Sequence, residues 1–163
     1  DGFLSLGGDE DLKFAAVLNR HGKGTKFVGV VRGFGSKRGA YGATVSHDSH
    51  NLVVVYDNPA DALAVIRELR ACGGGKCCAL EGKVIGKIEL PVYGLISKLA
   101  AADLAKEILA MKGILRERLG LDVLNPVMRI VSLALPVIPE AKFSDIGLVD
   151  VVQQKIVSLE VND

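Results

Sequence analysis

The stretch Leu52-Val53-Val54-Val55-Tyr56-Asp57-Asn58-Pro59 decides the fold class, because it joins an apolar strand directly to the start of a helix. Its first five residues, 52–56, are continuously apolar, which is typical of a strand that is covered on both faces. Asn58 can cap the helix, Pro59 suits its first turn, and Asp61 places a negative charge near its positive end. The glycine triplet 73–75 ends the helix. We therefore expect a strand, a helix and a second strand in succession.

This succession over residues 52–80 is one βαβ unit, which we expect to be right-handed if both strands share a sheet. Similar apolar runs predict the other strands, at 13–19, 26–31, 43–46, 76–80, 83–90, 128–135 and 155–161. A stripe of apolar residues predicts a second helix over 100–119, and 144–150 is expected to be a turn or a short helix. The expected fold is α/β or α+β, a layered mixed β-sheet of about six or seven strands with two main helices.

Length and composition limit the classes of function. A chain of 163 residues suits a single domain spanning 1–163. With 20 basic and 19 acidic residues the net charge is +1, which argues against a nucleic-acid or anionic-membrane partner. The longest apolar run, 130–138, contains Pro136 and is shorter than the roughly 18 residues of a membrane span. No basic and apolar leader opens the chain. We expect a soluble, cytoplasmic domain.

The three cysteines and the first residue add two expectations. Cys72, Cys77 and Cys78 are an odd number, and adjacent residues of a strand point to opposite faces, so a bridge between Cys77 and Cys78 would be strained. No second pair of zinc ligands follows at a suitable spacing. We expect buried thiols.

Because the chain starts at Asp1 and not at Met, we expect a piece of a longer protein or a processed product.

The densest polar segment is His47-Asp48-Ser49-His50-Asn51, between two apolar strands. Two imidazoles, a carboxylate and an amide can relay a proton, bind a metal ion or grip a polar ligand. In an extended segment His47 and His50 would lie on opposite faces, so they could chelate one ion only if the chain turns between them. The alternative is a bend whose Asp48 and Asn51 side chains bond to nearby backbone groups.

Other segments carry weaker signals. The loop 33–39 contains Lys37 and Arg38 and free backbone N–H groups, as a phosphate-binding turn would, but it lacks the P-loop pattern and a following helix. Arg20 and His21 end a strand and could face a cleft or lie in solvent. The apolar run 133–140 contains two prolines, so it leaves the sheet either as a buried crossover or as a surface that packs on another domain or subunit.

Several of these segments resemble, in the same order, the C-terminal domain of bacterial and archaeal adenine deaminases. The matching strings are Arg20-His21-Gly22, Gly33-Phe34-Gly35-Ser36-Lys37-Arg38-Gly39-Ala40, Val45-Ser46-His47-Asp48-Ser49-His50-Asn51, Gly73-Gly74-Gly75, Leu90-Pro91-Val92-Tyr93-Gly94-Leu95-Ile96-Ser97, Asn125-Pro126-Val127-Met128 and the stretches 133–140 and 144–150. The resemblance covers nearly the whole chain. Two departures, Lys98 and the triplet 76–78, leave open a divergent homologue or a stand-alone copy with another role.

The resemblance implies that a catalytic barrel accompanies this domain, and it implies which reaction the two serve. The family belongs to the amidohydrolase superfamily and hydrolyses adenine to hypoxanthine and ammonia, with manganese or iron in a barrel that precedes this domain. Such a barrel needs about 250 residues. The only histidines here are His21, His47 and His50, which do not match the barrel's ligand pattern. The resemblance therefore implies an accessory domain without a metal of its own, inactive in isolation, whose partners are the barrel of the same chain, a purine substrate and a second subunit in a homo-oligomer.

The same resemblance suggests roles for individual residues. The catalytic candidates facing the barrel are His47, Asp48 and His50. The candidate substrate-binding residues are Ser49, Asn51, Lys37 and Arg38. In this interpretation the domain closes or buttresses the active site. Two alternatives stay open: a structural or oligomerisation module in which the polar segment is only a bend, and a purine- or nucleotide-binding regulatory domain that uses Ser36, Lys37 and Arg38.

Overall fold

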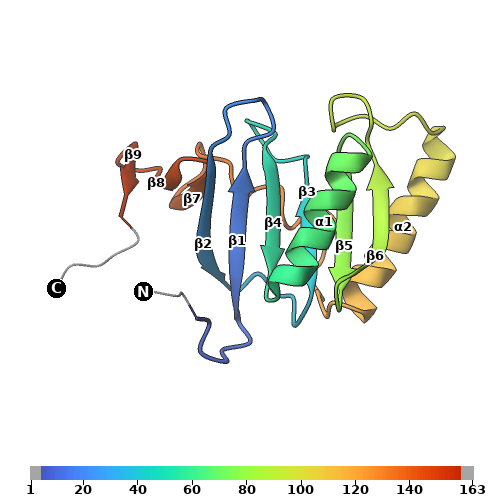
Figure 1. Cartoon of the computed structure of the whole chain (residues 1–163), viewed down its shortest axis with the longest axis horizontal. Helices are drawn as coiled ribbons and strands as arrows, with labels where there is room; N and C mark the ends of the chain where they lie inside the picture. Colours follow the sequence, from blue (N-terminus) through green and yellow to red (C-terminus); the bar gives the residue numbers. More distant parts are fainter. Residues whose placement is uncertain (1–4, 159–163) are drawn as a thin grey trace.

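The computed structural model describes residues 5–158 (Figure 1). The main sheet has the order β2-β1-β4-β3-β5-β6, with bounds β1 Leu12–Leu18, β2 Lys26–Arg32, β3 Ala40–Ala43, β4 Leu52–Tyr56, β5 Gly75–Leu80 and β6 Lys83–Glu89. The helices are α1 Pro59–Ala71 and α2 Ala101–Glu117. A smaller sheet beside β2 consists of β7 Ala141–Ser144, β8 Gly147–Asp150 and β9 Lys155–Val157. The predicted α+β class, with two main helices, is confirmed.

The pairing of the strands corrects one detail of the prediction. All neighbouring strands that the structure describes are antiparallel, so the main sheet is not mixed in its hydrogen-bonded pairs. The predicted unit β4–α1–β5 exists, and its two strands run in the same direction, but β3 lies between them and is antiparallel to both. A helical crossover leaves room for such an insertion, because it does not require its two strands to be adjacent.

Asn58 begins α1 as the sequence indicates, since its side chain accepts a hydrogen bond of 2.8 Å from the backbone N–H of Ala60. The prediction for 43–46 is wrong, because β3 ends at Ala43. The Thr44 N–H still donates to the Gly75 carbonyl at 2.9 Å, and its Oγ1 bonds to Gly75 and Gly94. Thr44 Oγ1 donates to the Gly94 carbonyl at 2.7 Å and accepts from the Gly75 N–H at 2.8 Å. The strand has the expected four residues but lies three positions earlier than expected.

Three further predictions near the C-terminus are corrected. The run 128–135 forms successive turns and not a strand, and it buries Ile130, Val131 and Ala134 against the sheet face without joining a ladder. The stretch 144–150 is not a helix, because it forms the turn and second strand of the β7–β8 hairpin. The last strand, β9, is short, and positions 159–161 of the predicted strand lie outside the described residues.

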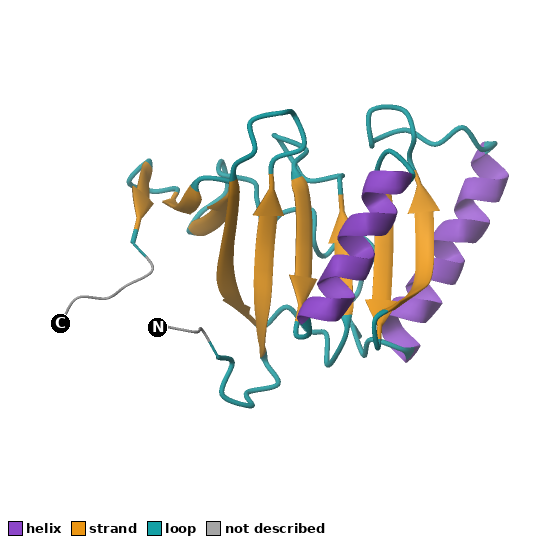
Figure 2. Ribbon diagram, viewed as in Figure 1, coloured by secondary structure: helices purple, strands orange, loops and turns teal. Residues whose placement is uncertain are grey.

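The core has two layers, one on each face of the main sheet (Figure 2). Helix α1 covers one face, with the buried residues Val65, Leu69, Leu52, Val54, Cys77 and Ala79. Helix α2 and the segment 119–134 cover the other, with Met111, Leu115, Leu119, Ile130, Val53, Val55 and Cys78. The predicted stripe of α2 therefore packs as expected. None of the helices within 5–158 is long and apolar enough to cross a membrane.

The three cysteines are free thiols, and the predicted burial is confirmed for Cys77 and Cys78, whereas Cys72 is half-buried. Cys77 and Cys78 belong to the two opposite core layers, and burial raises the pKa of each thiol to about 12. The apolar run 133–140 is buried only in part, and its packing on another domain or subunit stays a prediction. Ala134 is buried in the core, whereas Val137 and Ile138 are 66% and 46% exposed.

Candidate functional site

Three loops meet at one end of the main sheet. Strand register places residues 19–25, 44–51 and 90–100 there, because Leu18 pairs with Leu52, Ala43 with Lys76, and Gly75 with Glu89. Figure 1 shows these loops together above the sheet, at the top of the view. We call this region the histidine end, since all three histidines of the chain, His21, His47 and His50, lie in its loops.

The polar segment turns, and the turn brings its two histidines together. The backbone N–H of His50 donates to the Ser46 carbonyl at 2.7 Å, and His50 has a positive φ of 49°. The rings of His47 and His50 meet edge to face with centroids 5.2 Å apart. An extended segment would have placed them on opposite faces, so the turn creates the pair.

Arg20 fixes this turn from the neighbouring loop. Its Nε donates to the His50 carbonyl at 2.6 Å, and its Nη2 donates to the Tyr93 carbonyl of the third loop. Partial burial lowers the pKa of the Arg20 guanidinium. His21 adds a second link, since its Nε2 donates to the Ser49 carbonyl at 2.8 Å. The three loops are therefore held as one unit by cationic or imidazole donors on backbone carbonyls.

Buried polar atoms without hydrogen-bond partners are concentrated in the same segment. Among the residues that the structure describes, the three such side-chain atoms are Ser46 Oγ, His50 Nδ1 and Asn51 Oδ1. Buried polar groups are almost always hydrogen-bonded, and leaving one unpaired costs about 1–3 kcal/mol. Three such atoms within six residues mark this segment as one with unused hydrogen-bonding capacity.

The protonation of His50 follows from its surroundings. Burial lowers its pKa first, and the neighbouring His47 and Arg20 lower it further, while Asp48 opposes them. His50 is therefore neutral near pH 7 and offers both a donor and an acceptor nitrogen. His47, Asp48 and Ser49 are exposed, whereas Asn51 is buried. The exposed carboxylate and imidazole can reach an outside ligand, and the buried residues support them.

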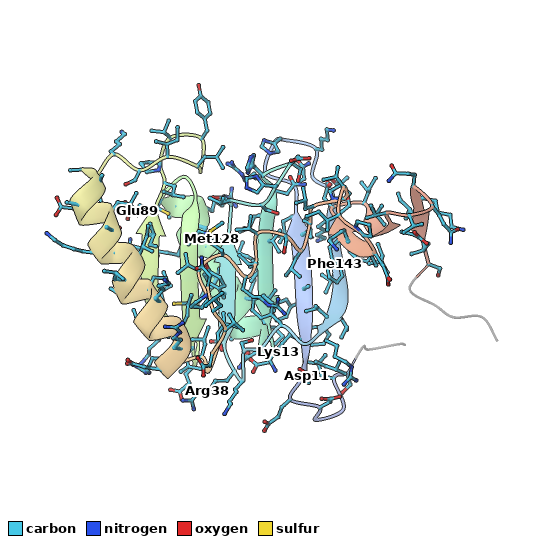
Figure 3. All side chains as sticks on the ribbon, turned by 180° about the vertical axis from the view of Figure 1, so that it is seen from behind. Asp11, Lys13, Arg38, Glu89, Met128 and Phe143 are labelled. Carbon is cyan, nitrogen blue, oxygen red and sulfur yellow. The ribbon has the colours of Figure 1, made fainter. Side chains whose placement is uncertain are left out.

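Lys37 and Arg38 do not join this site. Loop 33–39 lies at the opposite end of the sheet, where Leu12 pairs with Arg32 and Ala40 with Tyr56 (Arg38 in Figure 3). The Arg38 Nε donates to the Arg118 carbonyl at 2.9 Å, and the Lys37 backbone N–H donates to the Leu119 carbonyl at 2.8 Å. One binding site cannot contain both these cations and Asn51.

The same contacts bear on the phosphate-turn interpretation of that loop. Four of its backbone N–H groups are engaged: Gly33 donates to the Asp11 carbonyl, Lys37 and Arg38 donate to the Leu119 carbonyl, and Gly39 donates to the Asp57 carboxylate at 3.0 Å. Ser36 is buried. The loop therefore closes the end of α2 against the sheet, and these contacts favour a structural junction over the weakly indicated phosphate-binding turn.

Sequence reasoning underrated two residues at the histidine end. The sequence leaves open whether Arg20 faces a cleft or solvent. Only the strand order shows that its loop faces the His50 loop. Tyr93 is 83% exposed and left-handed (φ 56°), immediately beside the Arg20 contact. The polar signal of a Tyr-Gly turn after a strand could have pointed to it. A cavity of about 430 Å³ adjoins Arg20, between the sheet and α1.

The described residues do not fit a metal centre. No group of three or more His, Cys, Asp or Glu side chains among residues 5–158 is arranged to hold an ion. His21 Nε2 already bonds to Ser49, and the two other histidine rings contact each other edge to face. No reaction step is assigned to a metal on this chain. The expectation that the domain carries no metal of its own stays a prediction.

The chain is similar to one family of known proteins. The family described as "Adenine deaminase C-terminal domain" matches residues 1–155. Adenine deaminase of Moorella thermoacetica is 41% identical over 98% of this chain and 27% of that protein. Adenine deaminase 2 of Carboxydothermus hydrogenoformans is 38% identical over 92% of this chain and 26% of that protein. The chain thus spans about a quarter of the length of these relatives. It belongs to the adenine deaminase C-terminal domain family.

Proposed function

We propose that this chain is the accessory domain of a metal-dependent adenine deaminase, which converts adenine and water to hypoxanthine and ammonia. In this proposal the histidine end faces the active site of an amidohydrolase barrel in the same polypeptide. The barrel would hold the manganese or iron, whose role is to activate water. The family membership and the quarter-length match support a division of labour between this domain and a longer catalytic region.

The observation that carries the proposal is the exposed polar group His47, Asp48 and Ser49, which is held in one place at the histidine end. Arg20 and His21 fix the backbone of this turn through the carbonyls of His50 and Ser49. The turn is therefore ordered before it meets another surface, so little further ordering is needed on docking.

Individual residues take distinct roles in this arrangement. Asp48 and His47 are exposed and would bind polar groups at the rim of the reaction centre. His50 and Asn51 lie behind them and act as positioning residues, since they reach an outside ligand only through the surface of the turn. Tyr93 extends beside them and would help to exclude water when the domain closes. The isolated chain is expected to have no deaminase activity.

A second candidate function is an oligomerisation module. Val137 and Ile138 are exposed, lie side by side in the chain and follow a buried part of the same run. Exposed apolar neighbours of this kind favour an interface with a second copy or with the barrel. Sedimentation of the wild-type chain and of Val137→Ser/Ile138→Ser tests it: a dimer that the double variant disrupts supports this function, and a monomeric wild type contradicts it.

We further propose that the protein works in the cytoplasm. Its three cysteines are free thiols, which suits a reducing compartment.

The proposal is tested with a chimera. This chain replaces the matching C-terminal quarter of the Moorella thermoacetica enzyme, to which it is 41% identical. Adenine deamination is then measured with added manganese for the chimera, for the truncated relative and for this chain alone. We expect activity from the chimera, much less from the truncated protein and none from the chain alone. Turnover by the chain alone, or equal activity without it, would contradict the proposal.

A further inference from the structure

Lys76 is a buried cation that the proposed function does not use. It lies on β5, with a pairing register opposite Ala43 and Ile88, and is 7% exposed. Its Nζ donates to the Val127 carbonyl at 3.0 Å. Among the described residues, no carboxylate lies within ion-pair distance of it. The amine therefore keeps hydrogen-bonding capacity and a charge that nothing described here balances.

A cavity of about 300 Å³ lies beside this amine, between the sheet, α2 and the segment 125–128 (Met128 in Figure 3). Its walls are mainly aliphatic, with Ile88, Leu90, Leu104 and Ile108 among them. The polar residues of the lining are two lysines, Lys76 and Lys112, and Asn125, with no acidic residue. A cavity whose lining combines cationic side chains with aliphatic walls fits an anion that has an apolar body.

The electrostatics agree with such a ligand. Burial lowers the pKa of Lys76 to about 8, so about nine in ten of these amines still carry a charge at pH 7. An unpaired buried cation is unfavourable, because it has lost its hydration without gaining a counter-charge. A carboxylate would replace that hydration with a charge-assisted hydrogen bond. A dianion would have to lose far more hydration to enter the same aliphatic space.

We propose that this cavity binds a small organic monocarboxylate with an unbranched apolar tail. The carboxylate pairs with Lys76 Nζ, Lys112 adds positive charge from α2, and the tail packs against Leu104 and Ile108. The site lies on the α2 face of the sheet and borders the histidine end, because its lining includes Val45, Leu90 and Leu95 from two of the loops of that end. It would allow a metabolite that is not a purine to bind this domain.

Calorimetric titration with hexanoate tests the proposal on the 163-residue chain, with two matched compounds as controls. Hexylamine has the same tail and the opposite charge, and acetate has the charge without the tail. We expect saturable binding of hexanoate, no binding of hexylamine and at least about tenfold weaker binding of acetate. These comparisons need no variant, so they hold whether or not a substitution alters folding.

Two variants then locate the site. Lys76→Met should weaken hexanoate binding at least about tenfold, because it removes the charged donor while keeping the length of the side chain. Lys83→Met, an exposed lysine on the adjacent β6, is the matched control and should bind as the wild type does. Absence of hexanoate binding, equal binding of hexylamine, or unchanged affinity in folded Lys76→Met would overturn the proposal.

Discussion

The Nε of Arg20 donates a hydrogen bond of 2.6 Å to the backbone carbonyl of His50, although 30 residues separate them in the chain. The same guanidinium also bonds to the Tyr93 carbonyl. One side chain thus determines where the histidine turn and the exposed tyrosine lie relative to each other. Because both acceptors are backbone atoms, the arrangement depends on the fold and on Arg20, and not on the types of residue it holds.

Gly94→Ala should disturb this contact. A Cβ at position 94 would lie 2.8 Å from the Arg20 Nη2, in addition to the strain of an alanine at φ 73°. Gly82→Ala is the matched control, because its φ is 74° and nothing lies within 4 Å of its Cβ. Both variants bear about 1–2 kcal/mol of left-handed strain.

Urea unfolding of the two variants separates the clash from that strain. Gly94→Ala should lose about 1–3 kcal/mol more unfolding free energy than Gly82→Ala, since a hydrogen bond to a charged group is weakened. In an Arg20→Met background the two substitutions should become equal, because the clashing group is gone. Equal losses in the wild-type background would show that Arg20 does not restrict position 94.

The neutral state of His50 gives a prediction for pH. Its pKa in the folded chain lies below the ordinary value because of burial, His47 and Arg20. A base with a lowered folded pKa stabilises the fold fully above the unfolded pKa of about 6.5, and this stability decreases as the pH falls below that value. An NMR titration of the imidazole signals should place the His50 midpoint under 6.5, and His47→Ala should raise it. A wild-type midpoint at or above 6.5 would contradict the assigned environment.

Asp145 gives a second prediction for pH, with the same sign and at more acidic values. Hydrogen bonds from Thr25 Oγ1 and from Asn19 Nδ2, the latter 3.0 Å long, lower the pKa of this carboxyl. Its stabilisation is therefore complete above the unfolded pKa of about 3.9 and disappears as the pH falls through the lower folded value. Asp145→Asn should lose about 1–3 kcal/mol of unfolding free energy at pH 7 and show a flatter acid dependence.

The control for this measurement is Asp122→Asn, whose carboxylate is 91% exposed. It should follow the wild-type curve of unfolding free energy against pH between 7 and 3. If Asp145→Asn also follows that curve, the contact between the β1–β2 loop and the β7–β8 turn contributes nothing to stability.

Local signals in the sequence were sufficient for much of the fold. The apolar run of β4, the Asn58 cap and the stripe of α2 each depend on neighbouring residues, and each is observed. The prediction of a strand at 128–135 was wrong because an apolar segment can be buried against a sheet as well as within it. Only tertiary contacts decide between these two outcomes, and no periodicity records them.

The candidate site, like the fold, could be predicted from the sequence only in part. The clustering of His47, Asp48 and His50 is visible in the sequence, and the structure brings their loop together with Arg20. Lys37 and Arg38 lie at the other end because the strand order determines which loops share an end, and strand order depends on non-local pairing. Family resemblance could not separate them, since both segments match the family.

The central claim is that the histidine end of this domain works at the reaction centre of a preceding barrel. The most direct test measures kcat/KM for adenine in the chimera with His47→Ala, with Asp48→Ala and with the exposed opposite-end control Lys37→Ala. The account predicts that each of the first two variants loses about ten- to hundredfold while folding normally, and that Lys37→Ala keeps the parental value. Equal kcat/KM in all three variants would contradict it.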